Sequence, residues 1–271
     1  MRDDAEETLL RGRLVDMQSA EGAYRRCAED GDLYKLLSEP ALRRHTTLKP
    51  EPDKDALVRI YDQGMVNRKE GRALYDRIKA LAPYGDCPLC GIGEVDTLDH
   101  YLPKAYFPLC AIMPINLVPA CMHCNHDKGP AVPDSPVTQP LHPYFDQLGQ
   151  GRWLVAEILP TTPVAVRFGV QPLPEWSDVL TARVKRHFTA YNLDMRYRLK
   201  AAGHLAGRRH RHRQLLNIDA ELLRETLCEE AESWTQSNPN AWETALYFAL
   251  AGSDWYLTKG LDEEQALHAD V

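Results

Sequence analysis

The sequence predicts an α+β protein that is mainly helical, with a small cysteine-rich module embedded in it and a short β-hairpin. Three observations predict this fold class. Apolar residues recur at helical spacing towards both ends of the chain. The stretch 83–130 crowds Pro, Gly, Cys, His and Asn together and loses that spacing. Two short runs typical of strands, 153–159 and 164–170, are separated by Pro160-Thr-Thr-Pro163, as in a hairpin.

Residues 1–82 form the predicted N-terminal helical region. Early apolar positions recur every three or four residues, at Leu9, Leu10, Leu14 and Met17. The same period returns in residues 56–61 and again in residues 71–81, and Pro50-Glu-Pro52 separates these later helices from the first.

Residues 83–130 form the predicted metal-bearing module. Four of the seven cysteines fall as two close pairs, Cys87-Pro-Leu-Cys90 and Cys121-Met-His-Cys124. The acidic N-terminus lacks the basic start and apolar run of a signal peptide, so we expect a cytoplasmic protein with reduced thiols, which favours a metal over disulfides. Four thiolates complete a tetrahedral shell, which predicts structural zinc. Because this stretch lacks a helical period, we expect it to be stabilised by something other than a large apolar face.

Residues 131–271 form the third predicted region. Its first part, to residue 152, is rich in turns, and the hairpin follows. The helical pattern then extends from Pro174 to about residue 235 and from residue 241 to about residue 257, with a break at Asn238-Pro-Asn240.

Charge excludes some classes of protein. The 271 residues contain 32 Lys and Arg against 39 Asp and Glu, a net charge of −7, which argues against coating nucleic acid by bulk attraction. The sequence contains no long uncharged apolar run, so it predicts neither a membrane span nor a membrane partner. Any site for nucleic acid must therefore be a local patch.

One basic segment offers such a patch. Residues 183–213 hold ten Lys or Arg and a single acid, Asp194. This predicts a surface that faces phosphates, with Arg208, Arg209 and Arg211 as candidate contacts. The alternative is a solvated helix face paired with the acidic segment 219–232, and the sequence leaves both open.

Three segments follow one another in the central stretch: Cys87-Pro-Leu-Cys90-Gly, Leu98-Asp-His-Tyr-Leu-Pro-Lys104 and Asn116-Leu-Val-Pro-Ala-Cys-Met-His-Cys-Asn-His-Asp-Lys-Gly129. In this order they resemble the HNH endonuclease family in its four-cysteine version. The resemblance implies that 83–130 is a ββα-metal module framed by zinc. The apolar loop 105–115 departs from the Gly-rich turn of many relatives, and we expect it to pack against the flanking helices.

The resemblance also implies roles for individual residues. Asp99 would bind a catalytic Mg or Mn ion, with Asn125 as second ligand, and His100 would be the general base. A carboxylate suits these ions, and an imidazole titrates near neutrality. Asn116 would tie the loop backbone and help to orient the base. Lys128 either contacts a phosphate or is an ordinary exposed lysine.

The implied activity is hydrolysis of DNA phosphodiester bonds to leave a 5′ phosphate and a 3′ hydroxyl. The Asp99-His100 segment, Asn116-Leu-Val-Pro and His142-Pro-Tyr-Phe145 are also similar to HNH proteins of Septu-type antiphage systems, which implies an ATPase partner and a role in antiviral defence. His142-Pro-Tyr-Phe145 either forms a second wall of the site or anchors a loop on the core, and we favour the anchor. The alternative function is a non-catalytic zinc ribbon that binds nucleic acid or protein.

Overall fold

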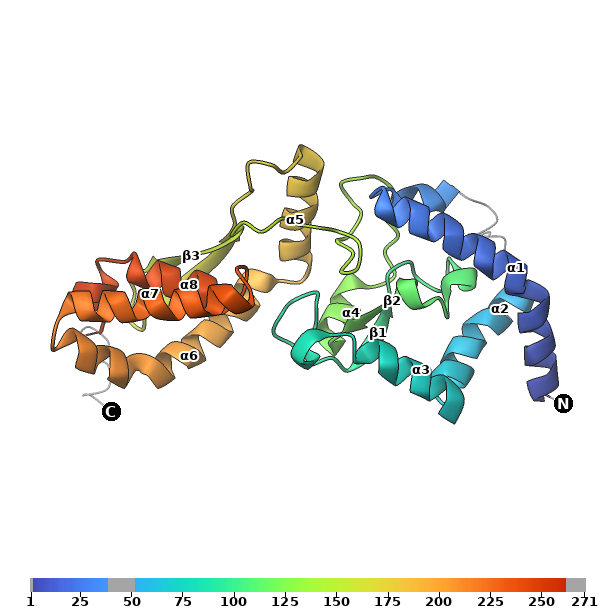
Figure 1. Cartoon of the computed structure of the whole chain (residues 1–271), viewed down its shortest axis with the longest axis horizontal. Helices are drawn as coiled ribbons and strands as arrows, with labels where there is room; N and C mark the ends of the chain where they lie inside the picture. Colours follow the sequence, from blue (N-terminus) through green and yellow to red (C-terminus); the bar gives the residue numbers. More distant parts are fainter. Residues whose placement is uncertain (1, 39–51, 262–271) are drawn as a thin grey trace. The chain divides into compact units, whose positions relative to one another are not determined.

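The computed structural model describes residues 2–38 and 52–261. This part of the chain is α+β and mainly helical, with two small two-stranded sheets (Figure 1), so the predicted fold class is confirmed. The chain divides into two compact units, Met1–Gln147 and Leu148–Val271. The module 83–130 lies inside the first unit together with the N-terminal helices. Of the break predicted at 50–52, residues 50 and 51 lie outside the described residues.

Helices form the N-terminal part of the first unit: α1 (Arg2–Glu29), α2 (Pro52–Arg59) and α3 (Lys69–Lys79). A π-helical segment, η2 (Ile60–Met65), continues α2 towards α3. Gly71 in α3 lies directly against η2, because a Cβ at this position would be 2.2 Å from the carbonyl oxygen of Gly64. Only glycine permits this close approach.

The predicted module has the order strand, strand, helix. β1 (Thr97–His100) pairs antiparallel with β2 (Leu117–Ala120), and α4 (Met122–Lys128) follows almost at once. The register places His100 opposite Leu117. Pro119 donates no hydrogen bond, and β2 tolerates it because each strand of a two-stranded sheet has an open edge.

The module shares its apolar core with the N-terminal helices. One cluster joins residues of η2 and α3 to residues of the module: Tyr61, Met65, Tyr75, Ile78, Leu98, Ala111 and Leu117. The expectation that 83–130 depends on something other than an apolar face was therefore wrong in part. Its apolar side chains come from short irregular segments, which leave no period in the sequence. The apolar loop 105–115 packs as expected, since Phe107, Cys110 and Ala111 are buried and the turn Pro108–Cys110 contacts α1 and α2.

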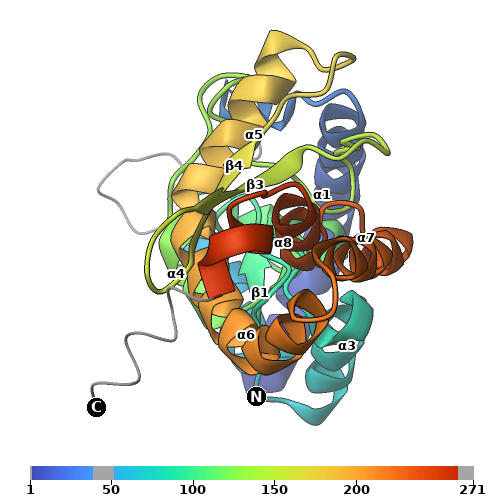
Figure 2. The same ribbon diagram turned by 90° about the vertical axis from the view of Figure 1, so that its left-hand side faces the viewer.

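The second unit contains the predicted hairpin. β3 (Leu154–Leu159) and β4 (Ala165–Val170) pair antiparallel, with Leu154 opposite Val170. β3 packs against α8, and β4 packs against α6 (Figures 1 and 2). The hairpin therefore forms one side of a mainly helical unit.

Four helices complete the described part of the second unit: α5 (Asp178–Ala190), α6 (Leu193–Leu216), α7 (Ala220–Ser237) and α8 (Trp242–Ala251). The helical pattern predicted from 174 to about 235 is thus divided twice. Asn192 has a left-handed φ of 49° and separates α5 from α6. Asp219 caps α7 by accepting a hydrogen bond from the backbone N–H of Glu221. Within the described ranges, no helix combines the length and the apolar character needed to cross a bilayer.

Candidate functional site

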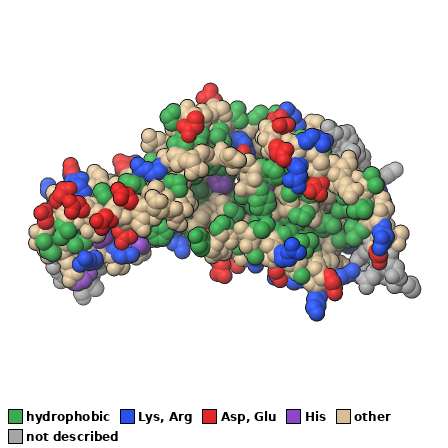
Figure 3. All heavy atoms as spheres, viewed as in Figure 1, with side chains coloured by type: hydrophobic (Ala, Val, Ile, Leu, Met, Phe, Trp, Pro, Cys, Tyr) green, Lys and Arg blue, Asp and Glu red, His purple; other side chains and the backbone are tan. Residues whose placement is uncertain are grey.

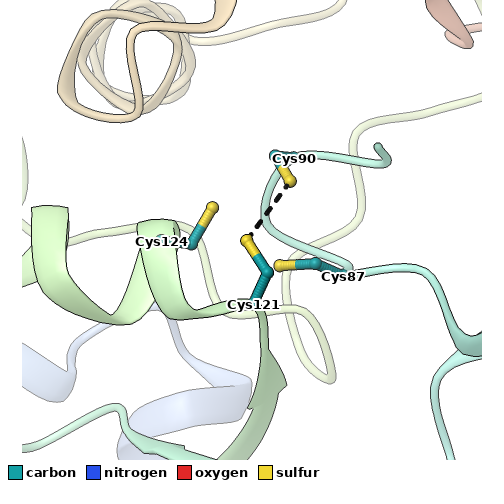
Figure 4. A group of neighbouring side chains, drawn as sticks. All are labelled: Cys87, Cys90, Cys121 and Cys124. Atoms are coloured by element: carbon teal, nitrogen blue, oxygen red, sulfur yellow. Dashed lines mark hydrogen bonds between the residues drawn. The ribbon is translucent and has the colours of Figure 1, made fainter. Parts of the chain in front are cut away.

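The four paired cysteines come together at the start of α4. Cys87 and Cys90 lie on a tight turn in which the N–H of Cys90 donates to the carbonyl of Cys87 (3.2 Å), while Cys121 directly precedes α4 and Cys124 lies in its first turn. The four Sγ atoms lie within 4.8 Å of one another, and those of Cys90 and Cys121 are 3.9 Å apart (Figure 4). Tetrahedral zinc with bonds of about 2.3 Å requires sulfur atoms about 3.8 Å apart, so the geometry fits zinc.

The crowding of these sulfurs suppresses their ionisation as long as no cation lies among them. Hydrogen bonds with Cys87 and Cys90 raise the pKa of the Cys124 thiol well above its usual range. Four crowded sulfurs acquire negative charge only when a metal ion balances it. In the described part of the chain, no other group of three or more His, Cys, Asp or Glu side chains could hold an ion. The cluster is a candidate zinc site whose four ligands leave no open position for catalysis.

Asp99 lies on β1 and is ion-paired with Lys128 of α4. The Lys128 Nζ is 3.0 Å from Oδ2 and 3.2 Å from Oδ1 of Asp99, and it also donates to the carbonyl oxygen of His100. The two side chains are only 6% and 9% exposed. Burial raises the pKa of Asp99, and the Lys128 ammonium opposes that rise. The pair fastens the last turn of α4 to the end of β1.

His100 follows Asp99 on β1, and its side chain contacts different residues from those that Asp99 contacts, as expected of adjacent residues on a strand. Its Nε2 is 2.8 Å from the carbonyl oxygen of Ala111. A carbonyl oxygen only accepts hydrogen bonds, so Nε2 carries the proton and Nδ1 keeps its lone pair. Burial lowers the pKa of His100 to about 4, so the ring is neutral at pH 7. A neutral imidazole with a lone pair on Nδ1 is able to accept a proton.

Tyr61 of η2 packs on the His100 ring. The ring centroids are 4.4 Å apart, the planes meet at 70°, and the Tyr61 hydroxyl donates to the carbonyl of Leu98 (3.3 Å). The Lys104 ammonium lies 4.5 Å from the Tyr61 ring centroid. The sequence did not reveal Tyr61 or the Ala111 carbonyl as neighbours of His100. The helical period in residues 56–61 signalled only that Tyr61 was buried.

Asn116 is fully buried and joins both ends of the loop between β1 and β2. Its Oδ1 accepts from the N–H of Leu102 (2.7 Å), and its Nδ2 donates to the carbonyls of Leu102 and Cys110 (3.0 Å each). The carbonyl of Ala111, next to Cys110, holds the His100 ring. Asn116 therefore fixes the backbone to which the imidazole is bonded.

Asn125 is half-buried on α4, one helical turn before Lys128. Residues three apart on a helix are neighbours on its surface, so Asn125 lies on the same side of α4 as the lysine that contacts Asp99. Its neighbours His123 and His126 are exposed. Asn125 therefore lies on the side of α4 that meets the end of β1.

One curated protein matches this chain over most of its length. Protein ea31 of Escherichia phage lambda is 30% identical over 251 residues, which cover 86% of this chain and 84% of the phage protein. The chain belongs to the ea31 family. No model of a known protein family matches the chain, and no solved structure matches it.

For this member of the ea31 family, the sequence also predicted that four basic side chains, Lys128, Arg208, Arg209 and Arg211, contact nucleic acid. Lys128 contacts Asp99 in the structure, and its side chain is almost wholly buried. Arg208 and Arg211 are exposed on α6, while Arg209 is half-buried. These arginines lie in the second unit, whereas Asp99 and His100 lie in the first. In Figure 3 the visible face of the second unit carries acidic side chains among the basic ones.

Proposed function

We propose that the chain is a metal-dependent endonuclease of the HNH type that hydrolyses DNA phosphodiester bonds. One observation carries the proposal. The adjacent Asp99 and His100 lie on the first strand of a strand-strand-helix unit whose helix begins at a four-cysteine cluster. This is the arrangement that the motif resemblance implies, and it holds a carboxylate and a neutral imidazole on one short strand.

In the proposed reaction, His100 acts as the general base. Its Nδ1 takes a proton from a water molecule, whose oxygen attacks the phosphorus while the bond to the 3′ oxygen breaks. The hydrogen bond from Nε2 to Ala111 and the packing of Tyr61 keep the ring in one orientation. Asn116 maintains the loop that carries the Ala111 carbonyl. The departing 3′ oxygen takes up a proton from solvent, so the products are a 5′ phosphate and a 3′ hydroxyl.

The oxygen donors of Asp99 and Asn125 suit a Mg or Mn ion. Such ions are commonly held by one or two carboxylates together with waters and substrate phosphates, so a site with few protein ligands fits them. The ion would stabilise the negative charge that develops on the departing oxygen. The chain's own part is to hold the Asp99 carboxylate at the end of β1, beside α4.

A plasmid-nicking assay tests the proposal. Zinc-loaded protein with Mg²⁺ or Mn²⁺ should nick DNA, and His100→Ala should lose about 100-fold or more of the rate because a positioned base contributes about that much. His210→Ala is a matched control, since His210 is an exposed histidine of α6 in the second unit. Nicking that survives His100→Ala in a folded protein would contradict the assignment of the base.

The second candidate is a zinc-binding module without catalytic activity. It is favoured by the ion pair of Asp99 with Lys128, because a carboxylate in such a pair has a structural role without any metal. This candidate predicts DNA or protein binding and no nicking with any divalent ion. The ATPase partner that the Septu resemblance implies remains a further prediction. If nicking appears only when that partner and ATP are added, the endonuclease proposal stands.

A further inference from the structure

The Lys128 ammonium lies where a cation bound by Asp99 would lie. Its distances of 3.0 and 3.2 Å to the two carboxylate oxygens place it against both of them. Its further hydrogen bond to the His100 carbonyl fixes it at the end of β1. Because both side chains are almost fully buried, little water separates the charges.

We propose that Lys128 competes with the catalytic cation for Asp99, so that the metal binds well only when nucleic acid is present. This inference rests on the proposed function. The free protein keeps the Asp99–Lys128 pair and binds divalent ions weakly. A DNA phosphate offers the ammonium another anion, releases Asp99 to the metal ion and provides that ion with additional oxygen ligands.

Electrostatics makes sharing of the carboxylate unfavourable. Two cations on one buried carboxylate repel each other strongly, because little water screens them. Asp99 without any cation would also be unfavourable, since it would leave a buried charge unpaired. One cation therefore replaces the other. By thermodynamic linkage, DNA raises the affinity for metal by the same factor by which metal raises the affinity for DNA.

The position of Lys128 in the fold allows the exchange. It is the last residue of α4, and Gly129, with a φ of 58°, ends the helix. The ammonium is carried on a flexible four-carbon chain, so it moves without displacing the backbone. Cys121 and Cys124 keep the start of α4 in place while the lysine at its other end moves.

Calorimetric titration of the zinc-loaded full chain with Mn²⁺, without DNA, tests the competition. Lys128→Met should bind Mn²⁺ at least about tenfold more tightly than the wild type, because Asp99 loses its competing cation. Lys128→Arg keeps the charge and should stay within about threefold of the wild type. Lys79→Met is a matched control, since Lys79 is a half-buried lysine that donates to the carbonyl of Asp96, just before the same strand.

A second titration tests the link to nucleic acid. In a His100→Ala background, which should slow cleavage about 100-fold or more, a short DNA duplex should raise the Mn²⁺ affinity when Lys128 is present. The increase should be much smaller with Lys128→Met. Equal increases with and without Lys128 would overturn the proposed coupling.

Two controls separate the possible failures. Zinc content and melting temperature establish that Lys128→Met is folded, and Lys128→Gln, which keeps a donor for the His100 carbonyl, should show the same tightening. If Asp99→Asn abolishes Mn²⁺ binding but neither Lys128→Met nor Lys128→Gln tightens it, the competition is wrong and the proposed function survives. If Asp99→Asn leaves Mn²⁺ binding unchanged, Asp99 is not the metal ligand and both proposals fail.

Discussion

The two units differ in one respect above all: within the described residues, the first unit holds the four-cysteine cluster and the second holds no such cluster. In the first unit, His100 and Asn116 bond to backbone groups of an irregular loop, and the sulfur cluster holds the helix that follows. In the second, His212 lies near the C-terminal end of the long helix α6 and bonds to the Tyr256 hydroxyl (2.7 Å). The first unit should therefore depend on a cation and on individual polar bonds, whereas the second should depend on packing between helices.

Loss of zinc should separate the two units most clearly. Cys121→Ser should unfold much of the first unit, because structural zinc contributes about 10 kcal/mol or more to folding in small zinc modules. The second unit should stay folded. Hydrogen exchange of the full chain, resolved by segment, measures both at once, and Cys228→Ser in α7 is the matched control. Equal exchange rates across both units in Cys121→Ser would show that their stabilities are not separate.

Two asparagines sharpen the same comparison. Asn116→Ala removes three hydrogen bonds from a fully buried position, and we expect a loss of about 3 kcal/mol in the free energy of unfolding. Asn240 also makes three hydrogen bonds to backbone groups, to Trp153, Leu154 and Gly151, but it is only half-buried. Water would replace part of what Asn240→Ala removes, so we expect a loss of about 1 kcal/mol.

Denaturant unfolding of both variants checks this difference. A similar loss in the two proteins would contradict the view that burial decides the cost. A change in nicking rate only with Asn116→Ala would support its role in holding the loop that carries the Ala111 carbonyl.

The second unit should lose stability in acid through His212. Burial and the nearby Arg208 lower its pKa to about 4, whereas an unfolded histidine titrates near 6.5. As the pH falls from about 6.5 to 4, His212 binds a proton in the unfolded chain but not in the folded one. The free energy of unfolding therefore decreases by up to about 3 kcal/mol. Above pH 6.5 this contribution is fully present. Urea unfolding at several pH values should show a shallower decline for His212→Gln, and an unchanged decline would contradict the assignment.

The smallest expected effect concerns the exposed arginines of α6. Reversing both Arg208 and Arg211 to Glu should weaken DNA binding by about tenfold and reduce its salt dependence if this helix meets phosphates. Reversing Arg11 and Arg25 in α1 changes the net charge equally and is the control. Equal DNA affinity for both double variants would indicate that α6 is only a solvated face.

The sequence was sufficient to predict features with a local signature. The cysteine spacing predicted the cluster, the turn-flanked strand runs predicted the hairpin, and the motif resemblance predicted a module with the order strand, strand, helix. Segment His142-Pro-Tyr-Phe145 is a loop anchor as predicted, because His142 is buried and bonds to the Tyr24 hydroxyl (2.9 Å). Each of these features is encoded within a few residues or by a fixed spacing.

Contacts made by the tertiary fold were not predictable. Tyr61 reaches His100 across 39 positions of sequence, and the partner of the imidazole is a backbone carbonyl, which any residue supplies. In the sequence, Lys128 is only a lysine at a helix end, and the packing of α4 beside β1 brings it to Asp99. The shared core of the module and the N-terminal helices was missed because it is built from short segments without a period.

Chemical rescue of the base tests the central claim most directly. His100→Ala protein, loaded with zinc and supplied with Mn²⁺, should cleave DNA slowly, and added imidazole should restore part of the rate by taking the place of the missing ring. His210→Ala should cleave at the wild-type rate with or without imidazole. Cleavage by His100→Ala at the wild-type rate, with no response to imidazole, would contradict the claim that this strand carries the base.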